Sequence, residues 1–377
     1  MEPKFVAPLF DNWDPPRLLH REGELREMLR HAAESSMPSN LWVEGAKGLG
    51  KTLTCKFFAE EVASKGLGKP LYIHCGSSLN NSIKRLCERE GVRITQRDLN
   101  PLGFVGSVLN AFPEEGRFYF IIDDPENLKD LRALDSLIRA VYNTLTAEGK
   151  IFSIIIVTRM SLKFAEHKMD SLRSDSRLNP HPIVFRPYDV PEIVSILEQR
   201  LHFAFGESDA WDREALFVIA KHIFRVGSDI REALSILRRA VGIAKDRLTV
   251  KEAGESVEYS KNMWWRSQML ALPPHWALML YTAAKNARVK GGCAEVEAQT
   301  VVSKYREEAK KLAADPLSKM PTYNALKKLS EIKGFFDLRR EGKGRREMLT
   351  ICFDVDSANH IVQAGSSLDW EILLAGS

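Results

Sequence analysis

Residues 45–52 read Gly45-Ala46-Lys47-Gly48-Leu49-Gly50-Lys51-Thr52. The run fits G-x-x-x-x-G-K-[ST], the loop with which many nucleoside triphosphatases bind phosphate. Its surroundings agree, because residues 41–44 predict a short strand and residues 53–63 predict an amphipathic helix. A glycine-rich turn is the alternative, but the order of strand, loop and helix favours a nucleotide site.

The chemistry of such a loop assigns a task to each residue type. Glycines let the backbone N–H groups close around an anion, and the start of the following helix adds its own N–H groups. Lys51 is expected to reach the β- and γ-phosphates, and the Thr52 hydroxyl is expected to ligate Mg²⁺. We therefore predict binding of a nucleotide with Mg²⁺. The predicted contacts are Gly45, Ala46, Lys47, Gly48, Leu49, Gly50, Lys51, Thr52 and Leu53.

Composition limits the class of protein. A chain of 377 residues is long enough for two or three domains, and its 44% hydrophobic and 28% charged content is typical of a globular protein. The net charge of +4 is small, so any basic surface must be local. The five cysteines have no metal-binding spacing, no signal peptide is recognisable, and the apolar runs are too short to cross a membrane. We expect a soluble cytoplasmic protein without a membrane partner.

The pattern of apolar segments predicts three domains. Five short apolar segments, separated by helical patterns, predict a doubly wound parallel α/β sheet. They lie at 41–44, 71–75, 118–122, 152–157 and 183–185. After Pro187 the pattern becomes helical, at 190–203, 211–224, 228–245 and 250–262. The predicted domains are an α/β domain at 1–189, a helical lid at 190–264 and a C-terminal domain at 265–377.

The last segment has the pattern of a winged helix. Helices are expected at about 274–288, 293–313 and 321–333. A β-hairpin of residues 335–339 and 347–353 follows, joined by a basic loop. Three helices followed by a hairpin are typical of a winged helix.

Several polar residues fall where a nucleotide site needs them. Asp123 and Asp124 end a buried strand, where one carboxylate can hold the Mg²⁺ bound by Thr52 and the other can act on water. Thr158 ends the next predicted strand and is a candidate for orienting that water. Arg177 is a candidate for stabilising phosphate charge in a neighbouring subunit. Arg231 opposes the dipole of the helix that it begins, which favours contact with a nucleotide.

These features together resemble the archaeal replication initiators, which are AAA+ ATPases. That family is related to the largest subunit of the origin recognition complex and to cell division control protein 6. Residues 18–25 are similar to the family's His-Arg-Glu segment, which lies against the adenine, and residues 183–188 and 196–200 resemble its passage from strand to lid. Residues 227–231 match its second sensor. The resemblance implies that the nucleotide is ATP or ADP, with contacts from His20, Arg21, Tyr188, Arg200 and Arg231.

Two residues depart from the family's pattern. Asp124 replaces the usual catalytic glutamate, and Thr158 stands where the first sensor is usually asparagine. Both changes are expected to weaken hydrolysis while leaving nucleotide binding intact. The resemblance therefore implies a slow, switch-like ATPase that holds ADP for long periods.

The C-terminal segment also predicts DNA binding. Residues 319–346 contain nine basic and three acidic residues, a net charge of +6. The candidate recognition helix carries Thr322, Tyr323, Asn324 and Lys327, and the hairpin carries Arg340, Lys343, Arg345 and Arg346. Polar and basic side chains of this kind suit a groove and its phosphates. By resemblance, Arg93 and Arg97 lie in a further DNA-contacting element. A solvated charged hairpin is the alternative for the wing alone.

The sequence thus predicts a nucleoid-associated protein that binds duplex origin DNA. By family resemblance its other partners are paralogous initiators and the replicative helicase. Two alternatives remain, a clamp-loader-like ATPase and a nucleotide-gated winged-helix transcription regulator. Fast DNA-stimulated turnover would indicate the first, and binding at promoters would indicate the second.

Overall fold

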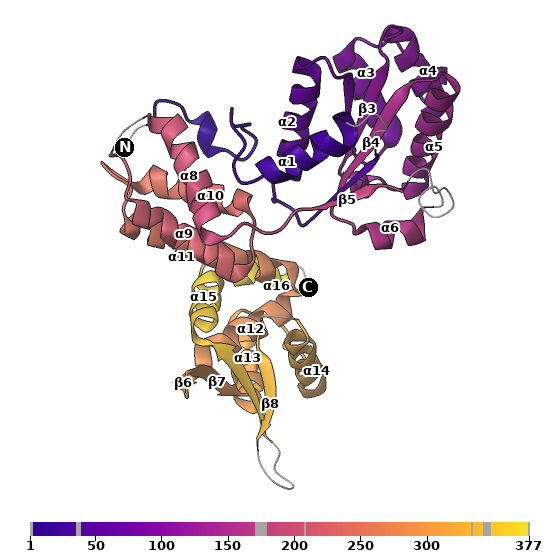
Figure 1. The fold of residues 1–377 in the computed structure, drawn as a ribbon. Helices are drawn as coiled ribbons and strands as arrows, with labels where there is room; N and C mark the ends of the chain where they lie inside the picture. The colour runs from indigo at the N-terminus through magenta and orange to yellow at the C-terminus, as the bar shows by residue number, and fades with distance from the viewer. Residues whose placement is uncertain are drawn as a thin grey trace. The chain divides into compact units, whose positions relative to one another are not determined.

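The computed structural model describes residues 3–34, 39–169, 179–206, 209–332, 335–341 and 348–375. The chain forms two compact units, Met1–Ala253 and Gly254–Ser377 (Figure 1). Each unit has its own hydrophobic core, and the two are described separately. The predicted boundaries at residues 189 and 264 stay a prediction.

A parallel five-stranded sheet organises the first unit. Its strand order is β2-β3-β4-β1-β5. The strands are β1 (Leu41–Glu44), β2 (Lys69–His74), β3 (Arg117–Asp123), β4 (Ile151–Thr158) and β5 (His181–Val184). All five predicted strands are confirmed, each to within two residues at either end. The predicted fold class, a parallel α/β sheet followed by helical domains, is confirmed as well.

Helices bury both faces of this sheet (Figure 1). Phe118, Phe120 and Ile122 of β3 face one core, while Tyr119 and Ile121 face the other. This alternation follows from the two-residue period of a strand, and burial on both sides is typical of parallel sheets. One core is covered by α3 (Leu79–Glu90), α4 (Pro101–Ala111), α5 (Leu131–Ala147) and α6 (Leu162–Lys168). The other is covered by α1 (Glu22–Met28), the short π-helix η2 (Leu29–Ala33) and α2 (Lys51–Ser64).

Four helices complete the pattern predicted after the sheet. They are α8 (Val190–Phe205), α9 (Arg213–Val226), α10 (Ile230–Ile243) and α11 (Val250–Ala271). Helix α8 begins with a reciprocal capping box between Asp189 and Glu192, which satisfies N–H groups at its first turn. The N-terminal segment packs against the same helix, since the Phe5 N–H donates to the Ala204 carbonyl over 3.1 Å. Helix α11 is nine residues longer than predicted and ends just before Leu272, where two prolines follow.

The second unit combines helices with a four-stranded antiparallel sheet of order β6-β7-β9-β8. Helices α12 (Pro274–Asn286), α13 (Ala298–Lys311) and α14 (Lys319–Ser330) precede the hairpin of β8 (Asp337–Glu341) and β9 (Met348–Asp354). This arrangement is that of a winged helix. Two short strands, β6 (Arg288–Lys290) and β7 (Cys293–Glu297), and two C-terminal helices, α15 (Val355–Ser366) and α16 (Trp370–Ala375), were not predicted.

The predicted helix at 293–313 is wrong over its first five residues. Residues 293–297 form β7, in which Ala294 and Val296 are buried opposite Phe353 and Ile351 of β9. Their two-residue alternation with Glu295 is a strand pattern. The strand was not predicted because the residues of helix α13 follow it without an intervening turn.

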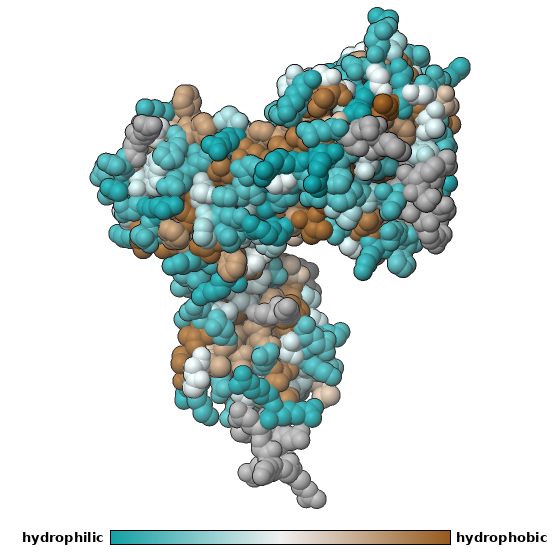
Figure 2. Space-filling model, viewed as in Figure 1, coloured by the Kyte–Doolittle hydropathy of each residue, from teal (hydrophilic) through white to brown (hydrophobic). Residues whose placement is uncertain are grey.

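Hydrophilic residues cover much of the face shown in Figure 2, with scattered hydrophobic patches between them. Within the described ranges, no helix is both long and apolar enough to cross a membrane.

Phe120 offers a direct test of the sheet's core. Its side chain is fully buried in the middle of β3, whereas Phe164 on α6 is 50% exposed. We expect Phe120→Ala to lower the free energy of unfolding by about 3–5 kcal/mol, because it leaves a cavity between sheet and helices. Phe164→Ala, the matched control, should change it by less than about 0.5 kcal/mol. Urea unfolding followed by circular dichroism measures both, and equal losses would contradict the assignment of the core.

Candidate nucleotide site and DNA-binding surface

The loop between β1 and α2 has a backbone that only glycine adopts without strain. Gly48 and Gly50 have φ angles of 72° and 85°, in the left-handed region. A Cβ atom on Gly50 would lie 2.6 Å from the Tyr188 hydroxyl, and one on Gly48 would lie 2.3 Å from the Asp229 Cβ. Tyr188, which follows β5, and Asp229, which caps α10, therefore pack closely against the loop. Helix α2 begins directly after the loop, at Lys51.

Lys51 is held over this loop by the loop's own carbonyl groups. Its side chain is 6% exposed, and Nζ donates to the carbonyls of Gly45 and Ala46, each over 2.8 Å. Burial lowers the pKa of Lys51, although the carboxylates of Asp124, Glu126 and Asp123 oppose the shift. A phosphate placed in the loop could accept these hydrogen bonds in place of the carbonyls. Lys51 thus lies where the sequence motif predicts it.

Thr52 and Asp123 lie together at the start of α2 and the end of β3. The Thr52 hydroxyl donates to Asp123 Oδ1 over 3.3 Å. The Tyr72 hydroxyl donates to Oδ2 over 2.7 Å, and the Asp123 side chain is buried. A hydroxyl and a carboxylate are the oxygen ligands that Mg²⁺ prefers. These two residues therefore fit the predicted cation.

His74 is a neighbour of this pair that was not predicted. It ends β2, is paired in the sheet with Asp123, and its Nδ1 lies 3.6 Å from Asp123 Oδ2. The Asp123 carboxylate raises the pKa of His74, against the effect of partial burial. The sequence signal that could have identified His74 is its position near the end of a predicted strand, as Asp123 is near the end of another.

Asp124 has an unusual backbone for a residue other than glycine. Its φ angle is 53°, and its N–H donates to the Val157 carbonyl over 2.9 Å. Burial is the main cause that raises the pKa of Asp124, and the negative charges of Asp123 and Glu126 raise it further. The side chain contributes to the wall of the cavity beside the loop. The shorter carboxylate is therefore on the cavity wall, and its part in hydrolysis stays a prediction.

A glutamate that was not predicted, Glu126, organises the end of β4. The Thr158 hydroxyl donates to Glu126 Oε2 over 2.8 Å and accepts the Met160 N–H over 3.0 Å. Glu126 Oε1 accepts from Arg159 through both the backbone N–H, over 2.9 Å, and Nε, over 2.7 Å. Burial raises the pKa of Glu126, but the hydrogen bonds from Arg159, from its own backbone and from Thr158 outweigh it, so the pKa lies below its ordinary value.

These contacts place Thr158 and Arg159 differently relative to the cavity. The Thr158 side chain is fully buried and is not on the cavity wall, whereas Arg159 is. Thr158 was predicted to orient water, but its hydroxyl already donates one hydrogen bond and accepts another. Arg159 is the β4-tip residue on the cavity wall, and the water-orienting role of Thr158 stays a prediction.

The cavity has a volume of about 630 Å³, within the usual range for small-molecule sites. Its wall combines the loop, residues 11–14 of the N-terminal segment and the helical part of the same unit. From the predicted residues it includes Lys47, Gly48, Leu49, Gly50, Lys51, Thr52, Leu53, Asp124, Arg200 and Arg231. Gly45 and Ala46 contribute through the carbonyls that hold Lys51.

The two arginines of the helical part reach the cavity differently. Arg231 is exposed in the first turn of α10, whose N-cap Asp229 accepts its backbone N–H. Arg200 is buried on α8, and burial lowers its pKa to about 10. Its Nη1 donates to the Trp13 carbonyl over 2.8 Å, and its guanidinium lies 4.8 Å from the centre of the Trp13 ring. Arg200 thus fixes the N-terminal segment at the edge of the cavity.

Three further residues with predicted nucleotide contacts, His20, Arg21 and Tyr188, do not line the cavity, and those contacts stay a prediction. Arg21 is fully buried; its Nε donates to the Leu49 carbonyl over 2.9 Å and its Nη2 to the Arg186 carbonyl over 2.6 Å. Its guanidinium lies 3.9 Å from the centre of the Tyr188 ring. His20 contacts Ser195 of α8. The resemblance located this segment but could not reveal which way its side chains turn.

The predicted recognition helix offers part of its polar residues to solvent. Asn324 and Lys327 are exposed on α14. Thr322 is fully buried and donates to the Ser318 carbonyl over 2.9 Å, so it is not available to DNA. Tyr323 is partly buried against the core of the second unit. Helical spacing puts Asn324 and Lys327 on one face, which leaves a smaller contact surface than predicted.

The other predicted DNA contacts are partly described. Arg340 is exposed on β8, and Arg93 and Arg97 are exposed between α3 and α4. Lys343, Arg345 and Arg346 lie outside the described residues, as does the candidate arginine finger Arg177.

The chain is also similar in sequence to known DNA replication proteins. An ORC1-type DNA replication protein of Desulfurococcus amylolyticus is 25% identical over 369 residues, which cover 92% of each chain. ORC1-type DNA replication protein 1 of Methanothermobacter thermautotrophicus is 27% identical over 360 residues, which cover 89% of this chain and 90% of its own. No family model matches the chain.

Solved structures resemble the fold along its length. The Aeropyrum pernix ORC1 protein, solved in complex with DNA, has a TM-score of 0.56 at 20% identity and covers 96% of this chain and 97% of its own. The Aeropyrum pernix ORC2 protein, solved as ADPNP–ADP complexes, has a TM-score of 0.59 at 16% identity, with full coverage of both chains. At these identities the likeness concerns the fold. Together with the relatives, it confirms the resemblance recognised in the sequence.

Glu126→Gln tests the contacts at the tip of β4. Because the folded-state pKa of Glu126 lies below its ordinary value of 4.5, its ionised form stabilises the fold at neutral pH. That contribution is lost as the pH falls through the folded-state pKa. We expect the variant to be less stable than the wild type by about 1–3 kcal/mol at neutral pH, with a gap that narrows in acid. Urea unfolding at about pH 7 and about pH 4 measures it.

Glu60→Gln is the matched control, because Glu60 is exposed on α2. It should leave stability nearly unchanged at both pH values. A gap between wild type and Glu126→Gln that widens in acid would contradict the assigned contacts.

Proposed function

We propose that this chain is a replication-origin-binding initiator, a nucleotide-dependent AAA+ protein that grips duplex DNA. The observation that carries the proposal is a phosphate-loop cavity, with Lys51 over the loop and Thr52 beside Asp123, in a chain similar to ORC1-type replication proteins over about nine tenths of its length. Nucleotide binding alone would fit many ATPases. The exposed basic residues of the second unit add the DNA-binding function.

The bound nucleotide is proposed to act mainly as a conformational ligand. Thr52 and Asp123 would hold Mg²⁺, which supplies positive charge to the phosphates when bound. Lys51 and the loop N–H groups bind the anion, and Arg231 and Arg200 reach the same cavity from the helical part. A ligand that contacts both parts favours the arrangement in which both contacts are made.

Hydrolysis is proposed to be slow for a geometric reason. A general base must reach the proton of the attacking water, either directly or through one further water. Asp124 is a methylene shorter than glutamate, and Thr158 has its hydroxyl committed to Glu126 and Met160. Neither residue is well suited to orienting a water molecule, so the site favours holding nucleotide over rapid turnover.

The second unit is proposed to bind duplex DNA through α14 and the β8–β9 hairpin. Asn324 and Lys327 would reach toward a groove, and Arg340 would lie toward the phosphates. The Aeropyrum pernix ORC1 protein, similar in fold, was solved with DNA. By the same resemblance we propose paralogous initiators and the replicative helicase as partners, and association with the nucleoid.

Asp124→Glu tests the proposed cause of slow hydrolysis. A longer carboxylate should reach the attacking water, and we expect single-turnover ATP hydrolysis to rise by at least about tenfold, with little change in ATP affinity. Asp246→Glu, at an exposed position after α10, is the matched control and should not change the rate. An unchanged or lower rate in Asp124→Glu would mean that another step limits hydrolysis.

Two measurements test DNA binding: its dependence on salt concentration and the effect of Lys327→Ala. If six to ten phosphates are contacted, the affinity for duplex DNA should fall by about 10³–10⁵ between 50 and 200 mM salt. Lys327→Ala should weaken binding and reduce the salt slope by about one. Lys310→Ala, at an exposed position on α13, should leave both unchanged. Fluorescence anisotropy at several salt concentrations measures these values, and a flat salt response would contradict the proposal.

Genome-wide footprinting of the wild type and Lys327→Ala decides between the two DNA-binding functions. Wild-type sites confined to replication origins, and lost in Lys327→Ala, would support the initiator. Sites spread over promoters would favour the transcription regulator.

A further inference from the structure

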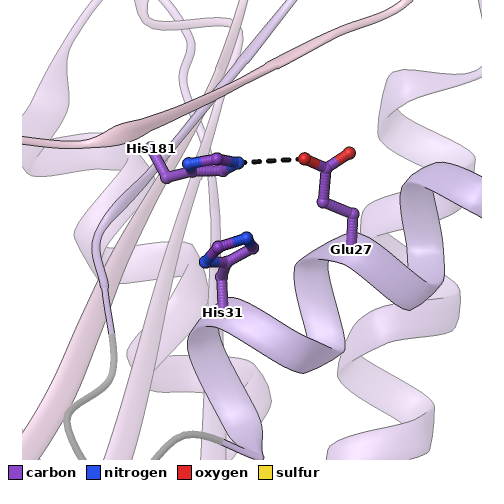
Figure 3. Close-up of side chains that lie close together, drawn as sticks. All are labelled: Glu27, His31 and His181. Carbon is purple, nitrogen blue, oxygen red and sulfur yellow. Dashed lines mark hydrogen bonds and ion pairs between the residues drawn. The ribbon is translucent and has the colours of Figure 1, made fainter.

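A second cluster of ligand-type side chains lies away from the nucleotide cavity. Glu27 of α1 and His31 of η2 are four residues apart on adjoining helical turns and therefore share a face. His181 is the first residue of β5, and its backbone N–H donates to the Asn40 carbonyl over 2.8 Å. Figure 3 shows the three side chains turned toward one another.

The geometry brings three potential ligand atoms together. One ligand atom from each residue lies within 4.8 Å of the other two. His181 Nε2 is 2.9 Å from Glu27 Oε1, and the two imidazole rings are stacked with centroids 3.9 Å apart. Glu27 and His181 keep 36% and 34% of their side-chain surface exposed, so an ion from solvent can reach them.

We propose that Glu27, His31 and His181 bind a divalent transition-metal ion, with Zn²⁺ as the first candidate. Two imidazoles and one carboxylate form a known three-ligand set for Zn²⁺, with water in the open position. Imidazole nitrogen favours such ions over Mg²⁺, which prefers oxygen ligands. Metal binding at this cluster does not depend on the proposed DNA and nucleotide functions.

Two local adjustments accompany metal binding. Parallel stacked rings do not aim their lone pairs at a common point, so at least one ring turns on its exposed side. Arg30 Nη2 also lies 3.2 Å from His31 Nε2. Because arginine only donates, that imidazole nitrogen accepts the hydrogen bond, and a metal can use its lone pair only after the Arg30 guanidinium turns away. The positive charge of Arg30 opposes the ion and weakens the site.

The position of the site indicates a structural effect. The metal would cross-link the segment α1–η2 to the edge strand β5 at the strand's amino end. The phosphate loop lies at the carboxyl ends of the strands, so the two sites are separate. A ligand that binds only the folded state raises its stability by mass action. The cluster is therefore expected to act as a metal-dependent clamp on the edge of the sheet.

Titration of the full-length protein with Zn²⁺ by calorimetry, with Co²⁺ absorption as a second probe, tests the proposal. The wild type should bind one equivalent at this site and unfold at a higher temperature with Zn²⁺ present. His31→Ala and His181→Ala should each lower the affinity by more than the ~10–100-fold that loss of an outer-shell partner costs. Arg30→Gln should raise it about 5–10-fold, because a repelling charge is removed.

His74→Ala is the matched control. His74, Asp123 and Asp124 form the other group within the described residues that could hold a metal. Zn²⁺ binding that persists in His74→Ala and disappears in the His31→Ala/His181→Ala double variant supports the proposal. Binding that disappears in His74→Ala and persists in the double variant overturns it, as does the absence of binding to the wild type.

Two further measurements keep the test decisive if a histidine variant fails to fold. Glu27→Gln keeps the side-chain shape and should still lower Zn²⁺ affinity. In the wild type, Zn²⁺ should protect His31 and His181 from diethyl pyrocarbonate, read by mass spectrometry, while exposed His167 remains reactive. Equal labelling of all three with and without Zn²⁺ would overturn the assignment.

Discussion

The hydrogen-bond register of the parallel sheet is the constraint on which the nucleotide site depends. Glu44 at the end of β1 is paired with Thr158 at the end of β4, and Asp123 of β3 is level with Val157. His74 of β2 is paired with Asp123. Because the strands are parallel, this register collects four chain segments, distant in sequence, at one edge. A slip of one residue in any strand would turn its last side chain to the opposite face.

Arg21 provides the second constraint, because it joins three parts of the first unit through one buried cation. Its guanidinium donates to the carbonyls of Leu49 in the loop and Arg186 after β5, and to Glu24 of α1. A buried charge without such partners would be strongly unfavourable, and here every contact is also a positional restraint. Displacement of the loop would therefore disturb the segment between β5 and α8 as well.

Much of the fold could be predicted from local pattern, since β-branched and aromatic runs mark strands that are buried on both faces. The phosphate loop, Asp123 and the start of α10 are likewise local signals. Side-chain direction was not predictable in the same way. Thr322 is buried because its hydroxyl closes a turn with Ser318, and Arg21 turns behind the loop because Leu49 and Arg186 accept its hydrogens. The partners of Arg21 are distant in sequence. The burial of Thr322 depends on which side of α14 packs against the core.

Glu126 illustrates why a motif can locate a site without fixing the hydrogen-bond partners of each residue within it. The motif directs attention to the position directly after Asp123, yet the nearby glutamate two residues later binds both Thr158 and Arg159. The Thr158 hydroxyl is thereby satisfied away from the cavity, and the Arg159 guanidinium, anchored through Nε, stays on the cavity wall. A phosphate near Arg159 would compete with Glu126 for that cation. The tip of β4 would then respond to the charge of the nucleotide through an ion pair. A neutral hydroxyl or amide side chain at this strand end would respond only through a neutral hydrogen bond.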